Sequence, residues 1–153
     1  MPTTLITHLF AHPQLIKSVA RMIYNEFWSD VIDGMSEDDL VAHLKSATDA
    51  ARIPLCFIAL HGNELVGTVN LIENDDAARN HLRPWLAAMV VREDQRSRGI
   101  GTKLVNALLN EARQMNIPAI YFGTDGPGFY ERIGAISHEK IRADFFIMKF
   151  ELR

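Results

Sequence analysis

The run Arg96-Ser97-Arg98-Gly99-Ile100-Gly101 combines residue types and a spacing that suit anion binding. It separates an apolar segment, 85–91, from an amphipathic one, 102–115, and therefore falls at a strand-to-helix turn. Its two glycines let the backbone pass close to a ligand, and the first N–H groups of the helix have no intrahelical acceptor. Its two arginines and Lys103 crowd the positive end of a helix dipole, where anions are favoured. The run therefore predicts a phosphate-binding turn.

Glycine-rich turns before helices also occur in two nucleotide-binding classes, and neither class matches this chain. A P-loop requires the string G-x-x-x-x-G-K-[ST], which the turn does not contain. A dinucleotide-binding unit requires G-x-G-x-x-G in the first β-α-β unit of its fold. Here Leu104 stands where the third glycine would be, and the unit begins late in the chain. The spacing therefore argues against ATP and NAD as ligands.

The elements that position this turn follow from hydrophobic periodicity. Residues 85–91 form a nearly continuous apolar run, typical of a strand covered on both faces. The helix over 102–115 and a strand over 119–123 complete a β-α-β unit with parallel strands. The pattern predicts one α/β domain over residues 1–153 with a mixed sheet. Further strands are expected over 4–10, 54–60, 65–72, 136–141 and 145–152, and further helices over 13–28, from a capping box of Ser36 and Asp39, and over 129–133.

A second motif follows the β-α-β unit. The string Gly128-Phe129-Tyr130-Glu131-Arg132-Ile133-Gly134-Ala135 places Tyr130 31 residues after Gly99. Together with the pattern Val91-x-x-x-x-Arg96-x-x-Gly99-Ile100-Gly101, this string resembles the GNAT superfamily of N-acetyltransferases. The resemblance covers residues 85–135, and the preceding order of a strand, two helices and a hairpin agrees with it.

The resemblance implies a fold and a ligand. The fold is a single domain with a mostly antiparallel mixed sheet of about seven strands and helices on both faces. The fourth and fifth strands splay apart around the thioester of acetyl-CoA, and we expect a bulge near Ala88 or Met89. The pyrophosphate would rest on the backbone of the glycine turn, and the pantetheine arm would pair with the preceding strand. The residues expected to contact acetyl-CoA are Met89, Val90, Val91, Arg96, Ser97, Arg98, Gly99, Ile100, Gly101, Thr102 and Phe129.

The same resemblance indicates residues for catalysis. Attack by an amine on the thioester expels a thiolate, whose conjugate acid has a pKa of about 8.5 by analogy with cysteine. The phenol of Tyr130 could donate a proton or a hydrogen bond to that sulfur. Glu73 is the expected general base for the amine, with Asp125 and Glu26 as alternatives. Nothing flanks Cys56 to activate its thiol, so direct transfer in a ternary complex is expected.

Composition limits the remaining functions. The net charge of −3 gives no reason to expect a nucleic-acid partner. Cys56 is the one cysteine, so no internal disulfide forms, and no apolar run approaches the roughly 18 residues of a membrane span. The first ten residues lack the pattern of a signal peptide, and the six histidines lack metal-ligand spacing. These features predict a cytoplasmic protein with no membrane partner and no metal.

The acceptor and the oligomeric state stay open at this point. The acceptor is expected to be a primary amine of a small molecule or peptide. Acidic residues over 30–39 and 73–76 could attract a cationic amine, although they could equally be solvated helix caps and loop charges. A homodimer is one option, with the strand over 145–152 as an edge for pairing. The alternative function is a regulatory domain that binds CoA and catalyses nothing.

Overall fold

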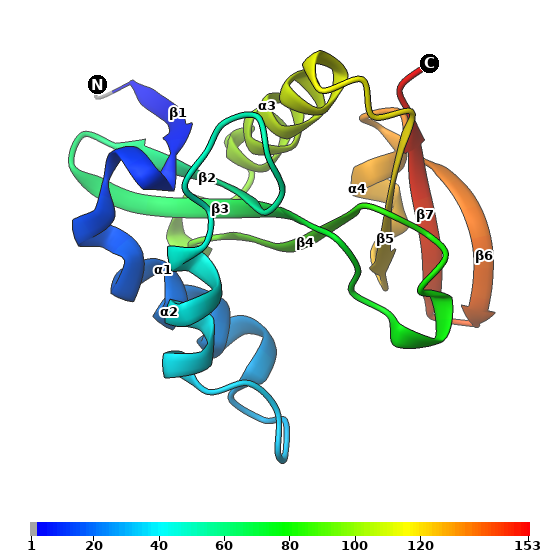
Figure 1. The fold of residues 1–153 in the computed structure, drawn as a ribbon, viewed down its shortest axis with the longest axis horizontal. Coiled ribbons are helices and arrows are strands. Elements are labelled where there is room, and N and C mark those ends of the chain that lie inside the picture. Colours follow the sequence, from blue (N-terminus) through cyan, green and yellow to red (C-terminus); the bar gives the residue numbers. More distant parts are fainter. Residues whose placement is uncertain (1–2) are drawn as a thin grey trace.

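Seven strands form one mixed sheet in the computed structural model, which describes residues 3–153 (Figure 1). The strand order is β1-β2-β3-β4-β5-β7-β6. Neighbouring strands are antiparallel except for β4 and β5, which are parallel. The predicted mixed, mostly antiparallel sheet is thereby confirmed. The strands are β1 (Thr4–His8), β2 (Leu55–His61), β3 (Glu64–Ile72), β4 (Trp85–Val91), β5 (Ala119–Thr124), β6 (Ile136–Arg142) and β7 (Phe145–Glu151).

Helices cover both faces of the sheet, as predicted (Figure 1). On one face α1 and α2 pack over β2, with Ile23, Leu40 and Ile58 in their common core. On the other face α3 lays its apolar side, including Leu104 and Leu108, against β2 and β3. Within residues 3–153 no helix has the length and apolar character needed to cross a membrane. The helices are α1 (Ile16–Ile23), α2 (Glu37–Lys45), α3 (Ile100–Gln114) and α4 (Pro127–Glu131).

The helical segment predicted over 13–28 contains three kinds of helix. It opens with a 3₁₀ turn at Pro13–Leu15, continues as α1, and ends as a π-helical turn at Tyr24–Trp28. The N–H of Ser29 donates to the carbonyl of Tyr24 at 2.9 Å, which closes the wider turn. Apolar spacing could not predict this ending, because it indicates which face is buried but not whether each bond spans four residues or five.

The predicted capping box begins α2. The N–H of Asp39 donates to the Ser36 hydroxyl oxygen, and the N–H of Ser36 donates to the Asp39 carboxylate, both at 3.0 Å. The bond to Ser36 holds the pKa of Asp39 below its usual value. This start fixes where α2 begins after the loop 29–35, and so places Leu40 and Leu44 in the core.

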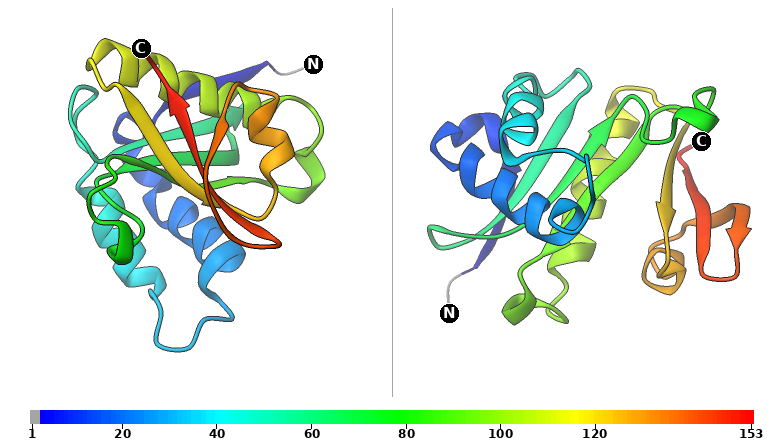
Figure 2. Two further views of the ribbon diagram at one scale, coloured as in Figure 1. Left: turned by 90° about the vertical axis from the view of Figure 1, so that its right-hand side faces the viewer. Right: turned by 90° about the horizontal axis from the view of Figure 1, so that it is seen from below.

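The two halves of the sheet diverge between β4 and β5 (Figure 2). These strands pair only at Trp85 and Tyr121 in the described part of the chain. On the other side of β4, Ala88 and Met89 together stand opposite Val69 of β3, and Ala88 has a φ of 52°. This is the bulge expected at Ala88 or Met89. Beyond Trp85, the side of β4 that faces β5 is therefore free to pair with a ligand.

One expectation about the sheet edge is wrong. The strand predicted over 145–152 is not an edge, because β7 lies between β5 and β6. Its Ile147, Met148 and Phe150 are buried, whereas β6 is exposed along almost its whole length. The last hairpin folds its more apolar strand inward, so the edges of the described sheet are β1 and β6.

Candidate active site

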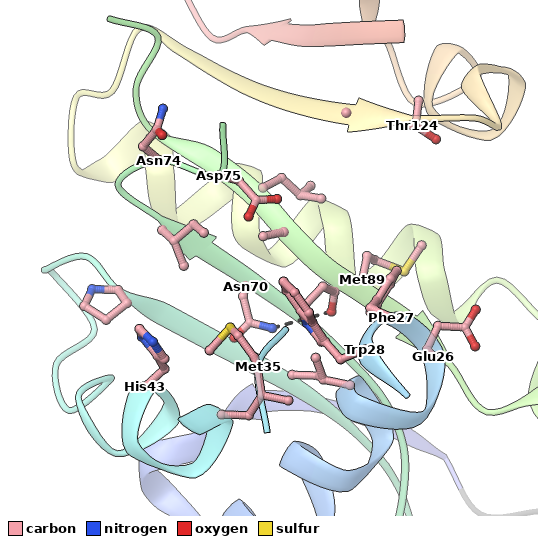
Figure 3. A pocket seen from close by; sticks show the side chains of 18 of the residues that line it. Glu26, Phe27, Trp28, Met35, His43, Asn70, Asn74, Asp75, Met89 and Thr124 are labelled. Carbon is pink, nitrogen blue, oxygen red and sulfur yellow. Dashed lines mark hydrogen bonds between the residues drawn. The ribbon is translucent and has the colours of Figure 1, made fainter. Parts of the chain in front are cut away.

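A cavity of about 720 Å³ lies where the two halves of the sheet diverge (Figure 3). One side is formed by the π-helical turn and α2, which contribute Glu26, Trp28 and His43. Its floor comes from β3 and the bulged part of β4, and its far side comes from the end of β5, α4 and β7. The cavity therefore spans the opening between β4 and β5.

The glycine turn carries a row of free backbone donors. In the described chain, no protein atom accepts a hydrogen bond from the N–H groups of residues 97–102. The first helical bond after them runs from the N–H of Lys103 to the carbonyl of Gly99, at 3.1 Å. Ser97 and Gly99 have φ values of 64° and 81°, which turn successive peptide groups away from the regular helical direction. Such a row of donors at the start of a 15-residue helix fits a pyrophosphate.

The aromatic motif lies directly against this turn. A Cβ added to Gly101 would stand 3.0 Å from Cζ of Phe129 and 3.6 Å from Cε of Met89. Met89 also lines the cavity, so the turn, the bulged strand and α4 meet at one place. The structure thus brings together the two sequence motifs and the strand predicted to hold pantetheine.

The three cations of the turn have different surroundings. Nε of Arg96 donates to the carbonyl of Val91 at 2.9 Å, and Nη2 of Arg96 lies 3.6 Å from the Glu26 carboxylate. The Arg96 side chain therefore joins the end of β4 to the π-helical turn. Arg98 is exposed, and among the described residues neither Arg98 nor Lys103 forms an ion pair. These two side chains are free to meet an anionic ligand.

Tyr130 lines the cavity from α4. Its ring packs between Phe122 and Phe129, with centroid distances of 4.4 Å and 4.9 Å. Burial, helped by the nearby charge of Asp125, raises the pKa of Tyr130 to about 12. The phenol is consequently protonated at neutral pH and available as a hydrogen-bond donor.

The structure does not bring Glu73 to the cavity. The Glu73 side chain is 61% exposed, and its carboxylate lies 3.8 Å from Nη1 of Arg83. Its rivals Glu26 and Asp125 do line the cavity, as does Asp75. Burial, with a smaller contribution from Asp76, raises the pKa of Asp75 above its usual value. Asp75 is nevertheless exposed to solvent, so it borders the cavity at its open side. The sequence contained the acidic cluster 73–76 but no signal for which of its members lines the cavity.

The loop after β3 holds Asp75 in place. The side-chain amide of Asn74 donates to the carbonyls of Arg79 and Leu82, each at 3.2 Å. Arg79 in turn donates two 2.9 Å hydrogen bonds to Glu139 of β6. The loop is thus tied both to itself and to the far half of the sheet, and Figure 3 shows Asp75 above the cavity floor.

Cys56 is part of the core, as the sequence indicates. Its side chain is 2% exposed, and burial raises the pKa of its thiol to about 12. The Cys56 sulfur lies 3.4 Å from the Thr68 hydroxyl. A thiol in this state is neither accessible nor ionised at neutral pH, so it is a poor nucleophile.

The family assignment rests on a sequence comparison. The model of the acetyltransferase (GNAT) family matches residues 20–135, which include the cavity wall, the glycine turn and Tyr130. The chain belongs to this family. No curated protein matches the chain at a significant level.

Solved structures share the fold over nearly the whole chain. An acetyltransferase of the GNAT family from Staphylococcus aureus Mu50 has a TM-score of 0.73 and 19% identity, covering 99% of this chain and 100% of that one. An aminoglycoside 6'-N-acetyltransferase complexed with coenzyme A has a TM-score of 0.74 and 18% identity, covering 97% of each chain. The PaiA N-acetyltransferase from Thermoplasma acidophilum, in complex with coenzyme A, has a TM-score of 0.71 and 14% identity, covering 97% and 99%. At these identities the likeness shows the fold alone.

Proposed function

We propose that this protein is a cytoplasmic N-acetyltransferase, with residues 1–153 as one domain, that uses acetyl-CoA to acetylate a primary amine of a small molecule or peptide. The observation that supports it most is the junction at Met89. This residue belongs to the bulged strand, lines the cavity and lies near Gly101 of the anion-binding turn. One ligand could therefore place its phosphate end at the glycine turn and its reactive end in the cavity.

In this proposal, the backbone donors of residues 97–102 bind the pyrophosphate of acetyl-CoA. Arg98 and Lys103 add positive charge, while Arg96 holds the end of β4 in place through the carbonyl of Val91. The free backbone groups of Met89, Val90 and Val91 pair with the pantetheine arm as an added strand would. Phe129 packs on Gly101 and fixes the position of α4 beside the arm.

The transfer itself forms a C–N bond and breaks a C–S bond. The amine nitrogen attacks the thioester carbonyl carbon, its excess proton passes to a carboxylate or water, and the thiolate leaves. Tyr130 donates a hydrogen bond to the departing sulfur. Full proton transfer from a phenol with a pKa of about 12 to a thiolate with a conjugate-acid pKa of about 8.5 is uphill by about 5 kcal/mol. Tyr130 therefore stabilises the thiolate as a hydrogen-bond donor, and the thiol gains its proton from solvent.

The acceptor amine must lose a proton before it attacks. Asp75 is the carboxylate that best suits this task, because it lines the cavity and its raised pKa brings it closer to neutral pH. The Glu26 carboxylate forms an ion pair with Arg96, and Asp125 lies near Tyr130. Glu73 is the base expected from the sequence, but it does not line the cavity and could take the proton only from outside it. Variants of Glu73 and Asp75 distinguish the two bases.

Thermal unfolding with matched concentrations of acetyl-CoA, CoA, ATP and NAD tests the proposal. A ligand at about 100 times its dissociation constant adds about 2.7 kcal/mol of apparent stability. We expect a clear rise in Tm with acetyl-CoA and CoA, and thiol release when primary amines are added. A Tm that responds to neither CoA species would refute the proposal. Binding without thiol release for any amine would favour a regulatory CoA-binding domain.

A further inference from the structure

Asn70 is a buried polar residue whose surroundings in β3 leave part of its side chain without a protein partner. It is 7% exposed and lines the cavity, as Trp28 and Met35 do (Figure 3). Thr68 lies two residues earlier on the same face of the strand and is the polar residue to compare with Asn70. The Thr68 hydroxyl donates to the carbonyl of Phe57 at 2.9 Å, and Thr68 does not line the cavity. The polarity of Thr68 is satisfied inside the protein, whereas that of Asn70 is directed toward the cavity.

The orientation of the Asn70 amide follows from its neighbour. Its Nδ2 lies 3.5 Å from the carbonyl oxygen of Ala88, a group that can only accept, so the amino half of the side chain faces Ala88. The Oδ1 atom has no donor among the described residues and is not sealed from the cavity. It is therefore an acceptor open to the cavity.

The Ala88 carbonyl is a second acceptor at the same place. Ala88 belongs to the bulge and has no partner in the register between β3 and β4. A carbonyl oxygen has two lone pairs, and the long bond from Asn70 uses one of them. Two acceptors thus lie side by side at the cavity floor, next to the opening between β4 and β5.

The rest of the cavity combines a few titratable groups with a largely apolar wall. The titratable groups that line it are Glu26, His43, Asp75, Asp125 and Tyr130. Glu26 is paired with Arg96, whereas Asp75 and Asp125 form no ion pair among the described residues. The remaining wall is largely apolar, and includes Phe27, Trp28, Met35, Ile72 and Leu86.

We infer that Asn70 Oδ1 and the Ala88 carbonyl accept the two N–H bonds of a primary amine carried on an apolar body. This inference rests on the proposed function and names its acceptor. A primary amine has two N–H bonds and one lone pair, so holding both bonds at the floor directs the lone pair toward the opening between β4 and β5. A secondary amine leaves one acceptor unpaired, which costs free energy in a buried site. Asn70 is therefore a positioning residue that selects primary amines.

Phenethylamine and N-methylphenethylamine test this with acetyl-CoA and a thiol-release assay. The protein should prefer the primary amine by at least about tenfold in kcat/KM. Asn70→Leu should lower kcat/KM for phenethylamine by about 10- to 100-fold and reduce the preference to about threefold, because one acceptor is lost. Thr68→Val is the matched control. It should keep the kcat/KM for phenethylamine and the preference for the primary amine. Acetyl-CoA should raise the Tm of both variants as it does for the unchanged protein.

The possible failures are separable. No response to acetyl-CoA would refute the proposed function itself. The protein could instead bind acetyl-CoA and acetylate spermidine but not phenethylamine, or acetylate neither amine. Either result would refute the inference that the acceptor is a primary amine on an apolar body. A folded Asn70→Leu protein that keeps its preference for the primary amine would refute the role of Asn70. If Asn70→Leu does not fold, Asn70→Val places here a β-branched side chain, shaped like the Thr68 side chain on the same strand face but without an acceptor. It should show the same loss of preference.

Discussion

The ring of Phe129 lies against Gly101, so closely that a Cβ at this position would be 3.0 Å from the Phe129 Cζ atom. The two residues come from the two motifs that the sequence separates by a helix and a strand. Their contact joins the start of α3 to α4 across the opening between β4 and β5. It gives Gly101 a steric reason to be glycine, beside its place in the anion-binding turn.

Gly101→Ala should weaken acetyl-CoA binding. The added methyl group requires the Phe129 ring or the start of α3 to move by a few tenths of an ångström. A shift of α3 would disturb the backbone donors that we propose bind pyrophosphate. We expect the dissociation constant for acetyl-CoA, measured by calorimetry, to rise about tenfold, which corresponds to about 1.4 kcal/mol. Asn106→Ala, an exposed change on the same helix, should leave it unaltered. Equal affinities in the two variants would show that the contact does not govern the turn.

Tyr130→Phe should lower kcat while acetyl-CoA binding is kept. The ring packing against Phe122 and Phe129 survives, and only the hydroxyl that we propose stabilises the thiolate is lost. Removing one such donor costs about 100-fold in kcat in comparable sites. Tyr121→Phe is the control, because Tyr121 packs on Trp85 and His138 and does not line the cavity. An unchanged kcat in Tyr130→Phe would exclude Tyr130 as the donor.

Arg96→Ala should raise the dissociation constant for acetyl-CoA more than Arg98→Ala does. The first change removes the bond to the Val91 carbonyl and the ion pair with Glu26, so the end of β4 and the π-helical turn both lose a support. The second removes only an exposed charge. We expect about tenfold for Arg96→Ala and about threefold for Arg98→Ala at low salt. If Arg96→Ala lowers Tm but keeps the affinity, Arg96 supports the fold and not the cofactor site.

Asp75→Asn and Glu73→Gln together identify the base. We expect kcat/KM for amines to fall about 100-fold in Asp75→Asn and less than about threefold in Glu73→Gln. In the unchanged protein the pH profile should carry an acidic limb, set by the raised pKa of Asp75, that Asp75→Asn removes. A large loss in Glu73→Gln with normal activity in Asp75→Asn would reverse the assignment.

The same Asp75→Asn variant should be slightly more stable than the unchanged protein at neutral pH. The gain should be small because Asp75 is exposed, so solvent screens its charge. Burial raises the pKa of Asp75, so the folded state favours the protonated acid, and ionisation opposes folding once the pH exceeds the usual aspartate pKa of about 3.9. The penalty is complete above the folded-state pKa. The difference in Tm between the variant and the unchanged protein should therefore be positive at pH 7 and shrink toward zero below pH about 4. A constant difference at all pH values would contradict this origin.

The sequence predicted those parts of the site that depend on neighbours along the chain. The glycine turn, the capping box of α2 and the paired aromatics of α4 are set within a few residues, and hydrophobic spacing is enough to order the strands and helices around them. The bulge at Ala88 was expected from the family resemblance and is present.

Contacts between distant segments decided the rest. Whether Glu73 or Asp75 lines the cavity depends on how Asn74 and Arg79 hold the loop, and their bonds reach Leu82 and Glu139. The position of β7 inside the sheet depends on the burial of the whole last hairpin. Asn70 gave no signal as a sequence position, because an asparagine within a strand becomes informative only when its neighbours leave an acceptor unpaired. Local sequence patterns were enough to predict the family, the fold and the position of a glycine turn suited to anions. Which polar side chains share the cavity became clear only from the folded chain, since that depends on contacts between residues far apart in the sequence.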